Sequence, residues 1–98
     1  MLTQTKNEDD VAFQRRLRIR LSVWAYAYEF MSESLVSDSY FDAACSQIDL
    51  TINTENSKLD IWWKENFTPS TGMWIRRHPD LSRIEELAVD AVKKMRND

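Results

Sequence analysis

The sequence predicts a small all-α domain of three or four helices that begins with an N-terminal helical hairpin. Its 98 residues suffice for a single domain. They include one Gly and two Pro, which is too few for the tight turns of an all-β chain. Apolar residues recur at intervals of three and four, which is the period of an α-helix. We expect residues 1–7 to be flexible and residues 8–98 to form one helical domain.

The first helix is expected to begin near Glu8 and to continue to Met31. Negative charge follows at once in Asp9 and Asp10, where the helix dipole favours it. The second half of this helix is apolar on nearly all sides, so it should lie at the centre of a bundle or meet another protein. Its main apolar face is expected to comprise Phe13, Leu17, Leu21, Trp24, Tyr28 and Met31.

A second helix should start after a short loop, with Ser37 or Asp38 as its N-cap, and end near Asn53. The chain contains one cysteine, Cys45, so it can form no internal disulfide, and we expect a buried thiol. The inner face of this helix is expected to comprise Phe41, Ala44, Cys45, Ile48 and Ile52.

Residues 58–67 predict a short third helix, and residues 68–79 predict an irregular segment, because they contain the only Gly and both Pro. The last helix should have Pro79 near its first turn. His78 has no second His or Cys at metal-ligand spacing, so we expect a surface or capping side chain and no metal site. The buried face of the last helix is expected to comprise Leu81, Ile84, Leu87, Ala88, Ala91, Val92 and Met95.

The bulk properties narrow the classes of function. A net charge of −3 argues against a general nucleic-acid coat protein. The sequence has no long apolar run and no signal-peptide pattern, so we expect no membrane contact and an intracellular location. It also shows no nucleophile–base pair and no Gly-rich phosphate loop. We therefore expect a protein that is not an enzyme and that carries no cofactor.

Four arginines lie within six residues of the first helix: Arg15, Arg16, Arg18 and Arg20. On a helix they spread around about three sides, so they form no single stripe. Guanidinium groups pair with carboxylates and phosphates. Three interpretations stay open: a solvated face paired with nearby acids, a basic patch for a protein partner at Arg15 and Arg16, and contact with DNA.

An aromatic cluster follows in the second half of the chain, next to Arg76 and Arg77. It comprises Trp62, Trp63, Phe67 and Trp74. Adjacent Trp residues on a helix point about 100° apart, so both are rarely fully buried in a small domain. These side chains could fill the core, form a protein interface, or stack on nucleic-acid bases.

The segment "YAYEFMSESLVSDSYFDAACSQI", residues 26–48, resembles the N-terminal helical hairpin of bacterial NAD-dependent DNA ligases. That family has a Tyr-His pair, a short loop, and Ser-Asp-x-x-Tyr-Asp at the start of the next helix. In the ligases this hairpin binds the nicotinamide mononucleotide half of NAD. The resemblance implies a nicotinamide-nucleotide site formed by Tyr28, Asp38, Phe41 and Asp42.

This chain departs from the ligase pattern at two positions. Phe41 stands where the family has its second Tyr, which keeps an aromatic face and loses the hydroxyl. Glu29 stands where the family has His, which places a carboxylate where a phosphate would approach. The adenylating Lys motif and the OB-fold are not recognisable, so the resemblance implies a binding module and no ligase.

Over the whole chain, the Arg-rich stretch "RRLRIRLSVWAYAYEF" and the stretch "ENFTPSTGMWIRRHPDL" resemble the anti-RecBCD proteins of lambdoid phages. The resemblance implies a phage-encoded protein of the host cytoplasm. It would bind and modulate the host RecBCD helicase–nuclease through its RecC subunit, protecting phage DNA ends and favouring recombination.

On this leading interpretation the expected partner contacts are Trp62, Trp63, Trp74, Arg76 and Arg77, with the Arg15 and Arg16 patch beside them. Pro69 is a further contact, which a host prolyl isomerase could bind. The alternatives are a nicotinamide-nucleotide-binding module and a DNA-binding accessory factor.

Overall fold

The computed structural model describes residues 8–69 and 71–97, and these contain no β-strand. The all-α prediction is therefore confirmed, while the expectation for residues 1–7 lies outside the described residues. The elements are α1 (Glu8–Met31), α2 (Asp38–Cys45), α3 (Ser57–Asn66), the 3₁₀ helix η1 (Met73–Arg77) and α4 (Leu81–Asn97).

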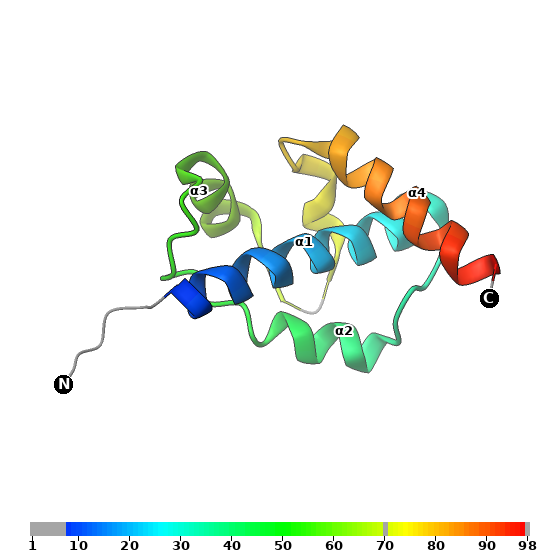
Figure 1. Cartoon of the computed structure of the whole chain (residues 1–98), viewed down its shortest axis with the longest axis horizontal. Helices are drawn as coiled ribbons and strands as arrows, with labels where there is room; N and C mark the ends of the chain where they lie inside the picture. The colour runs from blue at the N-terminus through cyan, green and yellow to red at the C-terminus, as the bar shows by residue number, and fades with distance from the viewer. Residues whose placement is uncertain (1–7, 70, 98) are drawn as a thin grey trace.

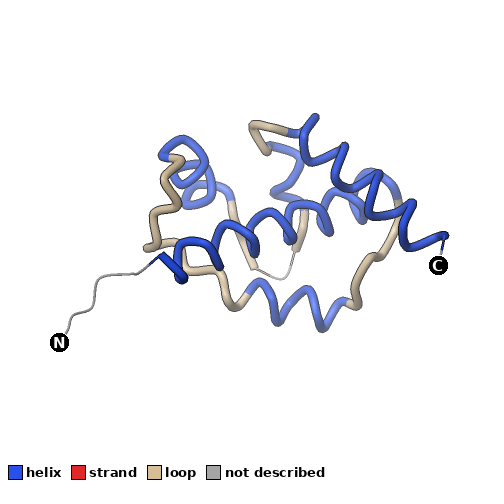
Figure 2. The backbone as a smooth tube through the Cα atoms, viewed as in Figure 1, coloured by secondary structure: helices blue, strands red, loops and turns tan. Residues whose placement is uncertain are grey.

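Helix α1 runs through the middle of the molecule, with α2 along one side and η1 and α4 along the other (Figure 1). It packs against α4, η1 and α2. The colours of Figure 1 show that α2 runs in the direction opposite to α1, and Figure 2 shows the irregular segments 32–37 and 46–56 that precede and follow α2. The expected N-terminal hairpin is therefore present.

The apolar core lies where α1, η1 and α4 meet. Leu21 and Ile75 are fully buried, and Ile84 and Ala88 pack in from α4. Burial of a side chain the size of Leu21 contributes roughly 1.5–3 kcal/mol. Ala25 of α1 is also buried, and its small side chain lets neighbouring segments come close to the helix backbone.

The buried face of α1 differs from the predicted one. Phe13 and Tyr28 are 42% and 58% exposed, whereas the polar Gln14 and Arg18 are buried beside Leu17. The face is rotated because segment 46–56, which packs against α1, has backbone groups that need polar partners.

Helix α2 starts as predicted and ends earlier than predicted. Ser37 is its N-cap, with Oγ accepting from the backbone N of Tyr40 at 3.2 Å. The helix ends at Cys45, and the prediction of an end near Asn53 is wrong. Beyond Cys45, side chains of α1 bind the backbone in place of helical hydrogen bonds. Cys45 itself is buried, as expected, and forms no disulfide within the described residues.

The third helix and the last helix appear where the sequence placed them. Pro79 lies just before α4, and His78 Nδ1 accepts from the backbone N of Asp80 at 3.0 Å. The His78 ring therefore stabilises the turn that precedes α4, and it is buried, so the expected surface position is wrong. At the other end of α4, Met95 is 41% exposed and does not extend the buried face.

Candidate functional site

A pocket of about 310 Å³ opens between the second half of α1, segment 32–37 and the first turns of α2; we call it the hairpin pocket. The four residues named by the ligase resemblance all line it: Tyr28, Asp38, Phe41 and Asp42. Small-molecule sites have volumes of about 300–1,000 Å³, so this pocket suits a small ligand.

Local structure explains how α2 directs its residues to the pocket. The Ser37 cap fixes the first turn of α2, so Asp38 and Asp42 lie one turn apart on one helix face. Phe41 lies between them in the sequence and is half-buried, packing against the core. Trp24 of α1 forms another wall, and its ring lies 5.7 Å from that of Tyr40.

Residues Thr71 and Gly72 complete the pocket from the far part of the chain. A Cβ at position 72 would lie 3.0 Å from Ala25 Cβ, so the absence of a side chain allows this close approach to α1. The sequence reasoning missed Trp24, Thr71 and Gly72 as lining residues. The only feature of the sequence that pointed to a close approach of this segment was the position of the single Gly within it.

The charges of the hairpin pocket are unequally compensated. Glu29 Oε1 accepts from Arg76 Nη2 at 3.1 Å, and that guanidinium also lies 5.0 Å from the ring centre of Phe30. Asp38 and Asp42 form no ion pair with any residue in the described part of the chain. The pocket therefore combines two uncompensated carboxylates with aromatic walls, an arrangement that favours a positively charged ring.

Most of the aromatic cluster belongs to the core. Trp63 and Trp74 are 2% and 4% exposed, and their ring centres lie 4.9 Å apart, with Phe67 packed against both. This burial corrects the predicted role of Trp63 and Trp74 as partner contacts, because a small core needs their bulk. Trp62 is only half-buried and touches His78 at a ring separation of 4.9 Å.

The other predicted partner contacts lie at the surface. Arg76, Arg77 and Pro69 are exposed, as are Arg15 and Arg16 of α1. No cis peptide bond occurs within the described residues. Binding of these residues to RecBCD or to a prolyl isomerase stays a prediction.

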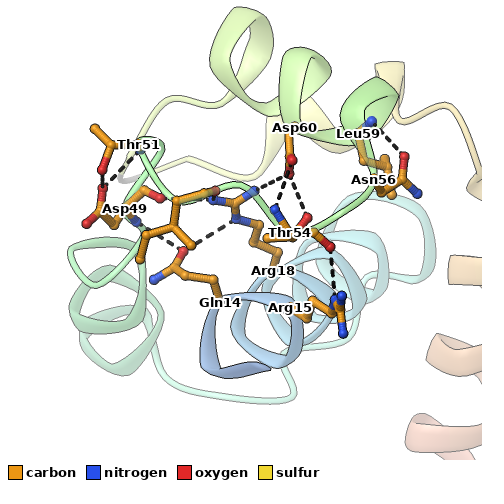
Figure 3. A network of polar contacts seen from close by, with 10 residues as sticks. Gln14, Arg15, Arg18, Asp49, Thr51, Thr54, Asn56, Leu59 and Asp60 are labelled. Atoms are coloured by element: carbon orange, nitrogen blue, oxygen red, sulfur yellow. Dashed lines mark hydrogen bonds and ion pairs between the residues drawn. The ribbon is translucent and has the colours of Figure 1, made fainter. Parts of the chain in front are cut away.

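Arg18 has a structural role that the sequence did not reveal (Figure 3). It is 5% exposed, and its Nη1 donates to Asp60 Oδ1 at 3.0 Å. Its Nη2 donates to the carbonyls of Asp49 and Ile52 at 2.9 and 3.1 Å. The Asp60 carboxylate also accepts from Thr54 N and Oγ1 at 2.9 and 2.6 Å. Arg18 is therefore unavailable to DNA or to a partner.

The rest of the Arg cluster divides into paired and exposed members. Arg15 Nε donates to the Thr54 carbonyl at 3.0 Å, and its guanidinium pairs with Glu55. Arg16 and Arg20 are exposed. Contact with DNA stays a prediction, and of the four clustered arginines only Arg16 and Arg20 form no ion pair with the described residues.

Burial lowers the pKa of two side chains described above, His78 and Arg18. It lowers the pKa of His78, and the nearby Asp80 carboxylate opposes that effect. A neutral His78 that accepts at Nδ1 carries its proton on Nε2, a tautomer assigned from the hydrogen bond to Asp80 N. Burial also lowers the pKa of Arg18, and the contact with Asp60 opposes this shift.

Comparisons with known proteins add no relative: no family model, no curated protein and no solved structure matches this chain. Within residues 8–69 and 71–97, no group of three or more His, Cys, Asp or Glu side chains could hold a metal ion. Across the same ranges, every helix is too short or too polar to cross a membrane.

Proposed function

We propose that this chain is a binding module whose hairpin pocket takes a nicotinamide nucleotide through its positively charged pyridinium ring. One observation carries the proposal: the four residues that the ligase resemblance singles out within segment 26–48 all line a single pocket. These residues are Tyr28, Asp38, Phe41 and Asp42. The module acts by binding, without chemistry of its own.

The chemistry of the pocket supports a cationic ring. Trp24, Tyr28 and Phe41 offer aromatic faces, to which a cation is attracted by about 0.5–2 kcal/mol. Asp38 and Asp42 add carboxylates that are acceptors only and have no ion-pair partner in the described chain. A free pyridine ring is neutral, so the positive charge of the ribosylated ring is the feature to be recognised.

The Glu29 substitution is compatible with this proposal. Its carboxylate is paired with Arg76, so the pocket does not present a third bare negative charge to an approaching phosphate. Phe41 supplies a ring face without a hydroxyl, so the proposal predicts one hydrogen bond fewer than in the ligase hairpin.

Isothermal titration calorimetry with matched ligands tests the proposal. Nicotinamide mononucleotide and 1-methylnicotinamide carry the cationic ring, and nicotinamide is the uncharged control. We expect saturable binding of both cations with a Kd of about 1 mM or lower, and much weaker binding of nicotinamide. No heat at millimolar concentrations of either cation would refute the proposal.

Variants locate the site. Asp42→Asn should weaken binding of 1-methylnicotinamide about tenfold, because it removes one attractive charge at short range. Glu86→Gln removes a charge from the exposed face of α4 and serves as the matched control. Equal affinities of the two variants would place the ligand elsewhere.

We also propose a second candidate function, the modulation of host RecBCD through RecC that the phage-protein resemblance implies. The partly exposed Trp62 touches His78, whose neighbour Arg77 is exposed, so an aromatic and a cationic side chain remain accessible on this face. Purified RecBCD nuclease should lose activity when the chain is added, and Arg77→Ala should weaken that inhibition. Arg16→Ala is measured in the same assay, so that the effect of removing an arginine from α1 can be compared with the effect at Arg77. Unchanged nuclease activity at micromolar chain would remove this candidate.

A further inference from the structure

A second cavity, of about 210 Å³, lies between α1, segment 54–56, α3 and the start of α4, and it shares no lining residue with the hairpin pocket. We call it the α3 cavity. Ile19, Leu59 and Ile84 form apolar parts of its wall. Its volume is below the usual range for small-molecule sites, so it suits a single ring with one polar group.

Trp63 lines this cavity and carries a donor that has no hydrogen-bond partner in the described chain. Trp63 is 2% exposed, yet its Nε1–H donates to no described residue, whereas Trp74 Nε1 donates to the Thr71 carbonyl at 2.6 Å. Every fully buried side-chain nitrogen or oxygen of the described chain has a partner. Trp63 Nε1 is therefore not fully enclosed, and of the two cavities described above Trp63 lines the α3 cavity.

His78 adds a second unused donor. Its Nδ1 is occupied by the backbone N–H of Asp80, so its proton lies on Nε2, which has no partner among the described residues. His78 is 8% exposed and lines the same cavity.

The charged groups around the α3 cavity leave one cation uncompensated. Arg15 pairs with Glu55, and the buried Arg18 pairs with Asp60. Arg83 lies in the first turn of α4 and forms no ion pair with the described chain. Its charge and the N-terminal end of α4 both attract an anion.

One lining group opposes an anion. The Asp80 carboxylate also lines the α3 cavity, at the start of α4. The oxygens of Asn56 and Thr54 are already engaged, the first as acceptor from Leu59 N and the second as donor to Asp60. Free donors therefore outnumber the single free carboxylate.

We propose that the α3 cavity binds an anionic oxygen group, carboxylate or phosphate, carried on a small flat apolar ring. The ring lies among the apolar side chains, while the anion accepts from Trp63 Nε1, His78 Nε2 and Arg83. The site is independent of the hairpin pocket and of the function proposed for it.

The experiment is a titration of ¹⁵N-labelled protein with benzoate and with phenyl phosphate, followed by ¹H–¹⁵N correlation spectra. The Trp63 indole resonance should shift saturably, and the Trp74 indole, already bonded to Thr71, should stay in place. The tighter of the two ligands identifies the anion. Benzyl alcohol, which has the ring without the charge, should bind at least about tenfold more weakly.

Two variants of opposite sign complete the test. Arg83→Gln should weaken binding about tenfold, and Asp80→Asn should strengthen it, with Arg16→Gln as the matched control on an exposed face of α1. Far-ultraviolet circular dichroism checks that each variant is folded. The proposal would be overturned if the Trp63 indole resonance did not shift, or if benzyl alcohol bound as tightly as the anions. It would also be overturned if Arg83→Gln and Arg16→Gln changed the affinity equally.

Discussion

Replacement of Asp60 by Ala tests whether the buried ion pair holds segment 46–56 and α3 against α1. The change removes the acceptor for Arg18 Nη1 and for both Thr54 N and Oγ1. The Arg18 side chain is only 6% exposed, so its charge would stay buried without a carboxylate partner.

The expected loss in unfolding free energy is about 3–5 kcal/mol, the range for breaking one side of a buried ion pair. The hydrogen bonds that the Asp60 carboxylate accepts from Arg18 and Thr54 contribute roughly 1.5 kcal/mol or more each, and their sum falls in the same range. A domain of this size has about 5–15 kcal/mol of stability in total, so the variant should be marginal. Its melting temperature should fall by at least about 12 °C.

Urea denaturation followed by circular dichroism at 222 nm measures this loss. Asp90→Ala is the matched control, because the Asp90–Lys94 pair on α4 has a similar separation of 3.1 Å and is largely exposed. Its loss should be below about 0.5 kcal/mol. A loss below about 1 kcal/mol for Asp60→Ala, with an unchanged denaturant slope, would refute the structural role of the pair.

The double variant Arg18→Met with Asp60→Ala separates the charge from its hydrogen bonds. The unfolding free energy of the double variant should fall by less than the sum of the falls in the two single variants, with a difference of at least about 1 kcal/mol, because no charge is then left unpaired. It should remain less stable than the original chain, since the carbonyls of Asp49 and Ile52 lose their donor. Additive losses would show that the two side chains act independently.

Three further changes test other parts of the structure. Gly72→Ala should lower the unfolding free energy by about 1–3 kcal/mol, because its Cβ would lie 3.0 Å from Ala25 Cβ; an unchanged urea midpoint would contradict this. Ser37→Ala should lose about 1 kcal/mol by removing the acceptor for Tyr40 N, and a neutral effect in the same assay would show that the cap is dispensable. Burial lowers the pKa of folded His78, so the unfolded chain binds more protons, and the unfolding free energy should fall as the pH drops below about 6.5. His78→Asn should make this fall smaller in urea midpoints measured from pH 7 to 5.5. An equal fall in the variant and the original chain would show that another group causes it.

The sequence predicted those parts of the fold that depend on local periodicity and capping. The extent of α1, the Ser37 cap and the positions of α3 and α4 follow from patterns within a few residues of each element. The core role of Trp63 and Trp74 could be named only as one interpretation, because burial depends on what packs around them.

The end of α2 and the buried face of α1 could not be predicted, for one shared reason. Both depend on Gln14 and Arg18 binding the backbone of segment 46–56, at sequence separations of 31 to 35 residues. Local patterns contain no trace of such contacts, and an Arg in an Arg-rich helix suggests a solvated side chain.

The hairpin pocket was half predictable. Tyr28 of α1 and Asp38, Phe41 and Asp42 of α2 were found through the ligase pattern, whereas Trp24 was missed and Thr71 and Gly72 reach the pocket through the tertiary fold. The pairing of Glu29 with Arg76 also spans 47 residues, so the compensation of its charge could not be seen in the sequence.

The Arg18–Asp60 pair also constrains how this sequence can diverge. The two residues are 42 positions apart, and either one alone would leave a buried charge without its partner. Distant relatives should therefore either keep both charges or lose both together, whatever happens to the exposed arginines nearby. A long first helix with a buried Arg, followed by an Asp in a short Trp-rich helix, is thus a pattern by which such relatives can be sought when overall sequence similarity is lost.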